Sequence, residues 1–221
     1  LSQYLANAKF AKEEFQPNLY IFTVISNDFD ESWLRYKSAE SAHYFDNKEN
    51  LTRIDFQPSK IGLLLRKSAF FRYLMIDLKI KNQLRVVFSS QTDGASTKKS
   101  KTNDVERLRY MNRAGEIFIR ELQKIAKDKK VILVFDGDRE TIYKGYKERD
   151  SYKNFNLAFR HLEEIASTIE NFIVVDLQET FSHDWSRYRK KFNYQNDFHW
   201  NEYGHRIVAG AIIKAVKKNV R

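Results

Sequence analysis

The sequence predicts a single α/β domain in which helices cover both faces of a mostly parallel sheet. Three short apolar runs, residues 19 to 25, 131 to 135 and 172 to 177, have the β-branched and aromatic composition of strands buried on both faces. Amphipathic stretches separate these runs, and strands that alternate with helices favour parallel pairing. The 221 residues, of which 42% are hydrophobic, suffice for one core, so we expect residues 1 to 221 to form one domain.

The other elements follow from helical periodicity and from residues that begin or end helices. The first helix is predicted to end at Gln16-Pro17, because proline cannot continue it. We expect Asp104 to cap a long helix whose apolar positions reach Ile125. The remaining expected elements are a hairpin over residues 42 to 57, a buried helix from Ser59, a low-complexity basic loop over residues 89 to 104, and helices near residues 154 to 169 and 202 to 216.

The composition narrows the chemistry without identifying a ligand. Basic side chains outnumber acidic ones by 39 to 29, and this net charge of +10 favours nucleic acid, an acidic glycan or an anionic membrane surface. The absence of cysteine excludes disulfides, thiolate zinc sites and a cysteine nucleophile. No apolar run approaches the roughly 18 residues of a membrane span. The start LSQYLANAKF has no signal-peptide pattern and predicts that the chain is a segment of a longer protein.

The most informative motif is NDFHWNEYGH, residues 196 to 205. Asp197 and His199 lie two residues apart before a helix, so their side chains can face the same way. The carboxylate can then hold the imidazole Nδ1–H and leave Nε2 free to accept a proton from a nucleophile. Alternatively, His199 is a turn residue and Asp197 a helix cap. A metal site that includes His205 is a further alternative, but the spacing matches no standard zinc pattern, and we expect His205 to be structural.

A second candidate is Asn27, in the stretch SNDF after the first predicted strand. An asparagine at the tip of a buried strand can donate its amide N–H to an oxyanion, which contributes about 3 kcal/mol in such sites. The alternative is a turn-forming Asn-Asp pair. Because this segment and the histidine motif both lie near the carboxyl ends of strands, one cleft can gather them.

Two stretches of the chain resemble blocks of the SGNH (GDSL-type) hydrolases. FQPNLYIFTVISNDF is similar to that family's third block, a strand ending in an Asn-Asp pair that carries the oxyanion-hole asparagine. NDFHWNEYGHRIVAGAI resembles the last block, in which an Asp shortly before a His completes the catalytic triad. Asp197 and His199 are separated by one residue. In this spacing the chain resembles the branch of the family that contains polysaccharide O-acetylation proteins.

The resemblance implies a three-layer α/β/α domain with a flavodoxin-like sheet. It also implies a serine esterase or O-acyltransferase that acts on carbohydrate or similar acyl esters, with no metal or organic cofactor. In this hypothesis His199 is the general base, Asp197 orients it, and Asn27 is an oxyanion donor. Because the proteins of this branch modify polysaccharides, the resemblance also implies a location in the cell envelope or periplasm. The alternative is a non-catalytic domain that binds an anionic glycan or nucleic acid, although we expect an acyl-ester or glycan substrate rather than nucleic acid.

The chain departs from the family in its nucleophile. The Gly-Asp-Ser block that carries the serine of the family, and a block with an oxyanion glycine, are both missing. The serines at positions 2, 26 and 32 have no Gly-Asp before them, and Gly137-Asp138 is followed by Arg139, which cannot attack an ester. We therefore expect the nucleophile to lie outside these 221 residues, and we expect negligible esterase activity from this segment alone.

Substrate contacts are predicted next to the histidine motif. The stretch SHDWSRYRKKFNYQ, residues 182 to 195, interleaves basic and aromatic side chains. Such a stretch can line a glycan cleft, stack on single-stranded nucleic acid, or form a lid whose aromatic side chains turn inward. We predict that Trp185, Trp200 and Asp28 bind the substrate.

Overall fold

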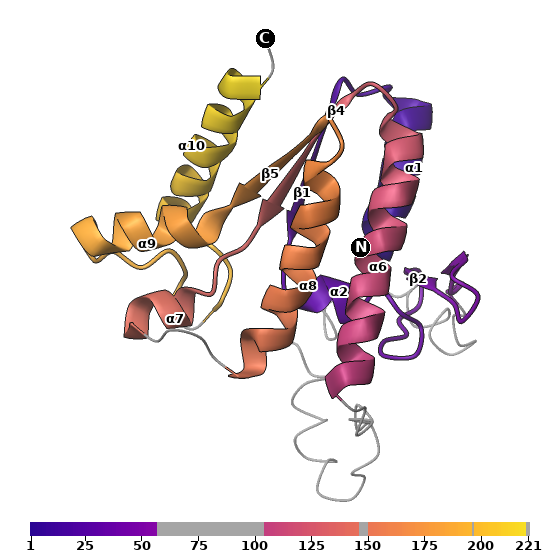
Figure 1. Cartoon of the computed structure of the whole chain (residues 1–221), viewed down its shortest axis with the longest axis horizontal. Coiled ribbons are helices and arrows are strands. Elements are labelled where there is room, and N and C mark those ends of the chain that lie inside the picture. Colours follow the sequence, from indigo (N-terminus) through magenta and orange to yellow (C-terminus); the bar gives the residue numbers. More distant parts are fainter. Residues whose placement is uncertain (57–103, 146–149, 196, 220–221) are drawn as a thin grey trace, which may run out of the picture. The chain divides into compact units, whose positions relative to one another are not determined.

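The computed structural model describes residues 1 to 56, 104 to 145, 150 to 195 and 197 to 219. The chain divides into two units, Leu1–Ile54 with Asn103–Arg221, and Asp55–Thr102. Every element labelled in Figure 1 belongs to the first unit. The helix predicted from Ser59 lies outside the described residues, and so do residues 89 to 103 of the loop predicted over residues 89 to 104.

Three parallel strands form the sheet that positions the candidate site (Figure 1). Strand β4 (Lys130–Phe135) lies between β1 (Leu19–Val24) and β5 (Phe172–Asp176). Both pairings are parallel. This confirms the α/β class and the three predicted strands. Because the strands run in one direction, their carboxyl ends meet at one edge of the sheet.

The side chains of β4 alternate between two hydrophobic clusters. Val131, Leu133 and Phe135 join a cluster with α1 (Ser2–Glu14), α6 (Asp104–Ala126) and α8 (Asp150–Ser167). Ile132 and Val134 join a second cluster with residues of α7 (Arg139–Lys144), α9 (Leu177–Tyr188) and α10 (Glu202–Asn219). All five strand residues are fully buried. The alternation explains why the strand is apolar throughout, since each of its faces meets helices.

The smaller elements are a one-turn helix and a hairpin. Helix α2 (Asn27–Asp30) begins three residues after β1 ends. Strands β2 (His43–Phe45) and β3 (Leu51–Arg53) pair in antiparallel fashion, which confirms the predicted hairpin. Asp104 is the first residue of α6 rather than a residue before it.

Helices α7 and α9 were not predicted, and both begin after a capping aspartate. Asp138 accepts a hydrogen bond from Thr141 N–H at 3.3 Å, and Asp176 accepts one from Gln178 N–H at 2.8 Å. Helix α9 covers the first half of the basic and aromatic stretch over residues 182 to 195. In the part of the chain that is described, no helix is both long enough and apolar enough to cross a membrane.

Candidate functional site

A cleft of about 580 Å³ opens at the carboxyl edge of the sheet. Three segments form most of it, because β1 and β4 end side by side and the loop before α10 lies next to them. The segments are Ile25 to Asn27 after β1, Asp136 to Glu140 after β4, and Phe198 to Trp200 before α10; Tyr4, Thr23, Tyr152 and His205 complete the lining. Three residues predicted from the sequence thus line one cleft: Asn27, His199 and Trp200.

Asp197 holds the ring of His199 through two contacts to the same oxygen. The backbone N–H of His199 donates to Asp197 Oδ1 at 2.8 Å, and the ring Nδ1 bonds to that oxygen as well. These two hydrogen bonds, the backbone one first, lower the pKa of Asp197. The His199 side chain is 88% exposed, and its Nε2 has no hydrogen-bond partner among the described residues. The pair therefore has the arrangement of a general base and its orienting carboxylate, built on a short turn at Asp197.

Trp200 anchors the histidine loop to the end of β4. Its Nε1–H donates to Asp136 Oδ1 at 3.1 Å, and its ring meets His205 edge-on, with the centroids 5.5 Å apart. His205 lies in α10 and also lines the cleft. Among the described residues, no group of three or more His, Cys, Asp or Glu side chains is placed to hold a metal ion.

Asn201 fixes the other side of the same loop. Its side-chain amide donates to the carbonyl oxygens of Lys191 and Asn193, both at 3.0 Å, and its Oδ1 accepts from Gly204 N–H at 2.9 Å. A Cβ atom at Gly204 would lie 2.3 Å from the carbonyl oxygen of Phe192, so only glycine fits there. The residues that follow the histidine thus fold the loop, and this places His199 at the cleft.

Asn27 and Asp28 differ in where their side chains lie. The Asn27 side chain is exposed, lines the cleft and has no hydrogen-bond partner among the described residues. Asp28 is not among the residues that line the cleft, and its carboxylate accepts from Ile25 N–H at 2.8 Å and from Tyr4 Oη–H at 3.1 Å. Burial raises its pKa, and the hydrogen bond from the Ile25 backbone N–H opposes that effect. Asn27 is therefore placed to meet a ligand, whereas Asp28 holds the turn between β1 and α2.

Trp185 is not brought to the cleft. It lies in α9 and packs on Tyr143, with ring centroids 4.7 Å apart. Phe192, farther along the same stretch, is fully buried, whereas Tyr188 and Tyr194 are exposed. Two aromatic side chains of residues 182 to 195 therefore serve the second hydrophobic cluster, and none of the four lines the cleft.

The segment Asp136 to Glu140 lines the cleft and was missed as a site. Arg139 Nη2 donates to Asp136 Oδ2 at 2.9 Å, and both side chains are largely buried. Burial raises the pKa of Asp136, and the Arg139 charge opposes that effect. The signal in the sequence is the position of Asp136 directly after a buried strand, which is also what distinguishes Asn27 after β1.

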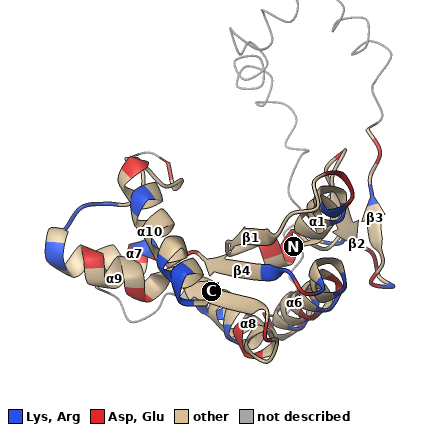
Figure 2. Ribbon diagram, turned by 90° about the horizontal axis from the view of Figure 1, so that it is seen from above, with Lys and Arg blue, Asp and Glu red and all other residues tan. Residues whose placement is uncertain are grey.

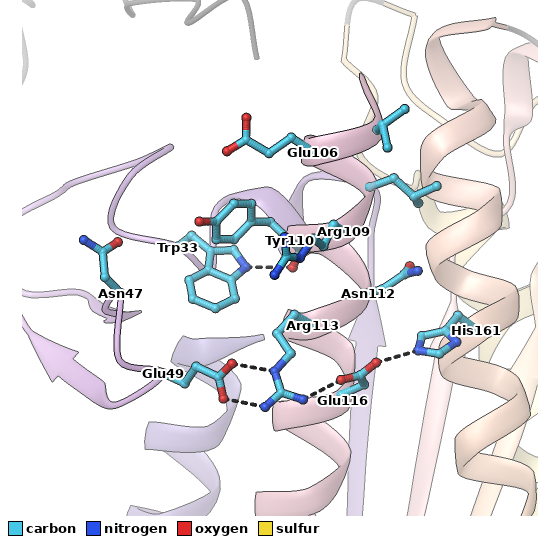
Figure 3. A pocket seen from close by; sticks show the side chains of 12 residues that line it. Trp33, Asn47, Glu49, Glu106, Arg109, Tyr110, Asn112, Arg113, Glu116 and His161 are labelled. Carbon is cyan, nitrogen blue, oxygen red and sulfur yellow. Dashed lines mark hydrogen bonds and ion pairs between the residues drawn. The ribbon is translucent and has the colours of Figure 1, made fainter. Parts of the chain in front are cut away.

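A second cavity, of about 660 Å³, is lined by none of the predicted site residues. Figure 3 shows Arg113 at its centre, between Glu49 and Glu116. Arg113 Nε and Nη2 donate to the two oxygens of Glu49 at 2.5 and 2.6 Å, and Nη1 donates to Glu116 at 2.6 Å. The other Glu116 oxygen lies 3.0 Å from His161 Nε2. These four charged or titratable side chains of the second cavity form hydrogen bonds with one another rather than pointing to a ligand. We therefore take the cleft at the carboxyl edge of the sheet as the candidate site.

No protein-family model, no curated protein and no solved structure matches this chain. The functional assignment therefore depends on the geometry of the cleft and on the chemistry of its residues.

Proposed function

We propose that the chain forms most of an SGNH-type domain, a three-layer α/β/α fold with a flavodoxin-like sheet, that acts as a serine esterase or O-acyltransferase. The substrates in this proposal are acyl esters of carbohydrates or similar compounds. The observation that carries it is that Asn27 and His199 line the same cleft, and that Asp197 is hydrogen-bonded to the ring of His199. The two residues are 172 positions apart in the chain, and each suits a different task in acyl transfer.

The proposed reaction proceeds through an acyl-enzyme. His199 Nε2 takes the proton of a serine hydroxyl while the serine oxygen attacks the ester carbonyl carbon. The Asn27 amide donates to the oxyanion that forms, and the negative charge of Asp197 stabilises the imidazolium. The bond to the leaving alcohol then breaks, and His199 returns the proton to that alcohol. In the second half of the reaction, water or a sugar hydroxyl gives its proton to His199 and attacks the acyl carbon, the bond to the serine oxygen breaks, and His199 returns the proton to the serine.

In this proposal the nucleophilic serine comes from outside these 221 residues. Within the described part of the chain, β1 pairs with β4 alone, so its other edge is free to accept a further parallel strand. Such a strand would end near Asn27. Ser2 and Ser32 are buried, and both form hydrogen bonds beneath the surface. Ser26 lines the cleft and is the alternative nucleophile within the chain. An experiment must distinguish it from a serine outside these 221 residues.

A non-catalytic role in binding an anionic glycan or nucleic acid is the second candidate. The observation that favours it is a group of four exposed basic residues, Arg187 at the end of α9 and Arg189 to Lys191 in the connection after it, where Figure 2 shows basic residues. Backbone phosphates or glycan carboxylates would contact such residues. This role requires no proton transfer by His199, and that difference separates the two candidates.

Hydrolysis of p-nitrophenyl acetate by the full-length natural protein tests the proposed function. We expect His199→Ala to lower kcat/KM at least about 100-fold, the usual contribution of a general base. His183→Ala, at an exposed histidine of α9, is the matched control and is expected to change little. Full activity in His199→Ala would contradict the proposal. Loss of activity in Ser26→Ala would instead place the nucleophile inside this chain.

A further inference from the structure

Helix α10 has one face that packs against the sheet and one face that is exposed and basic. The residues that pack with the second hydrophobic cluster are Ile207, Val208, Ala211, Ile212, Ala215 and Val216. The residues that alternate with them, at positions 206, 209, 210, 213, 214 and 217, are all exposed. Arg206, Lys214 and Lys217 are among these, and the helix has no Asp or Glu after Glu202. The exposed face is therefore cationic over about three turns.

Lys190, in the connection after α9, extends this basic face. Its Nζ lies 4.6 Å from the centroid of the Tyr203 ring, and Arg206 Cζ lies 5.3 Å from the same centroid. One tyrosine ring thus holds a cation from the connection and a cation from α10. The Tyr203 hydroxyl donates to Asp184, so the carboxylate at this place has a partner other than the two cations.

We call Lys190, Arg206, Lys214 and Lys217, together with Ile213, the basic stripe. In the part of the chain that the structure describes, none of its four cations forms an ion pair with a carboxylate. Residues 177 to 219 hold eight Lys or Arg against four Asp or Glu, so the surrounding segment does not neutralise the stripe. A surface with this excess of positive charge attracts an anionic partner.

Ile213 is a large apolar side chain in the middle of the basic stripe. It is 53% exposed, and it lies seven residues after Arg206 and four before Lys217, so the three side chains share one side of the helix. The residues one turn before it are Ala209 and Gly210, and a Cβ atom at Gly210 would have no heavy atom within 4 Å. These small neighbours leave Ile213 open to a flat surface.

The combination of cations with an exposed isoleucine fits an anionic lipid surface better than an acidic polymer. Lipid phosphates attract lysine and arginine, and an apolar side chain among them gains by entering the boundary below the headgroups. The phosphates of a nucleic acid or the carboxylates of a glycan would contact the cations alone. No residue of the basic stripe lines the cleft or the second cavity, whereas a single polymer strand usually follows a groove.

We propose that the basic stripe binds the surface of a membrane that contains anionic phospholipids. Its four cations lie at the headgroup phosphates, and Ile213 enters the layer between them. The proposal does not depend on the esterase or acyltransferase function, because none of the five residues lines the cleft.

Sedimentation of the 221-residue chain with lipid vesicles tests the proposal. One set of vesicles contains equal parts of phosphatidylglycerol and phosphatidylcholine, and the other contains phosphatidylcholine alone. We expect the chain to bind the anionic vesicles at least about tenfold more tightly, and added salt to weaken this binding. Binding to neither set, or equal binding to both, would overturn the proposal.

Paired charge variants assign the binding to the basic stripe. Arg206→Gln with Lys217→Gln is expected to weaken binding to the anionic vesicles about tenfold. Lys9→Gln with Lys153→Gln removes the same charge from exposed positions outside the stripe, and it is expected to keep most of the affinity. All four positions are exposed, and thermal unfolding checks that both variants fold. Equal losses in the two variants would show that net charge, and not the stripe, controls the binding.

Ile213→Ser separates a lipid partner from a polymer. The change leaves the charge as it is, so we expect it to weaken binding to the anionic vesicles about threefold by loss of apolar contact. Titration with polygalacturonate and with single-stranded oligothymidylate provides the comparison. Unchanged vesicle binding in Ile213→Ser would contradict the proposal. Tighter binding of either polymer than of the vesicles would also contradict it, since the stripe would then serve an acidic polymer.

Discussion

Arg113 ties the hairpin to helix α6. It bonds Glu49 in the connection between β2 and β3, and Glu116 one turn along its own helix. The hydrogen bonds from Arg113 lower the pKa of Glu49 from its ordinary value of 4.5. The folded protein therefore holds fewer protons on Glu49 than the unfolded chain does over this pH range. The resulting stabilisation is complete above pH 4.5 and is lost as the pH falls through the lowered pKa.

Arg113→Gln is expected to reduce the free energy of unfolding at neutral pH by up to about 1 kcal/mol, because the partners are partly exposed to solvent. The variant should also lose less stability than the wild type as the pH drops below 4.5. Urea unfolding at neutral pH and in acid measures both effects. Arg109→Gln, on the same helix, provides the control. Parallel loss of stability in the two chains on acidification would show that Arg113 does not set the pKa of Glu49.

Individual side chains were predictable where the local chain dictates their position. His199 and Asp197 are two residues apart, so a short turn brings them together whatever the rest of the fold does. Asp28 differs, because its partner Tyr4 lies 24 positions earlier and no local pattern links the two. The pairing of Arg139 with Asp136 is local, but its place in the cleft depends on the parallel alignment of β4 with β1.

Helix α10 contains two glycines with opposite surroundings. A Cβ atom at Gly204 would lie 2.3 Å from a backbone oxygen, whereas a Cβ atom at Gly210 would have no heavy atom within 4 Å. The first glycine permits the close approach of the loop to the helix. The second has no packing role, and alanine is a better helix former than glycine by about 1 kcal/mol.

Alanine at the two positions should therefore act in opposite directions. We expect Gly204→Ala to destabilise the protein by about 1 to 3 kcal/mol, through displacement of the loop that carries His199. Gly210→Ala is expected to stabilise it by about 0.5 to 1 kcal/mol. Thermal unfolding followed by circular dichroism compares the two. If both changes have the same sign, backbone propensity rather than loop packing controls the first position.

Elements with a long apolar pattern were predicted within a few residues, whereas the helices α2, α7 and α9 were not predicted. The strands β1, β4 and β5 each have a continuous apolar run, and both faces of β4 are buried against helices. Helix α9 buries mainly Leu177 and Phe181 among charged neighbours, which is too few apolar positions to define a period. Its ends are set by the cap at Asp176 and by the left-handed conformation of Arg189.

Over the whole unit, the two faces of the sheet are covered unevenly. Ile21 of β1 lies opposite Ile132 of β4 in the parallel ladder. Ile132 is fully buried under the second cluster, whereas the neighbouring Ile21 is 46% exposed. An edge strand with an exposed apolar side chain is suited to pairing with a further strand.

The same substitution at these two positions is expected to have unequal effects. Ile132→Ala should cost about 2 to 5 kcal/mol of unfolding free energy, and Ile21→Ala less than about 1 kcal/mol. Chemical unfolding of the 221-residue chain measures both values. In the full-length natural protein, where we propose a further strand beside β1, the cost of Ile21→Ala should rise. An unchanged small cost there would argue against a strand at this edge.

The three tryptophans differ in what their indole N–H groups bond, and this gives the protein three separate internal probes. Trp33 donates to the Tyr110 carbonyl at 2.8 Å, Trp185 has a buried Nε1 without a partner among the described residues, and Trp200 donates to Asp136. In a proton NMR spectrum each indole proton gives its own resonance. Solvent exchange of the Trp200 proton would then report the opening of the histidine loop without the need for a substrate.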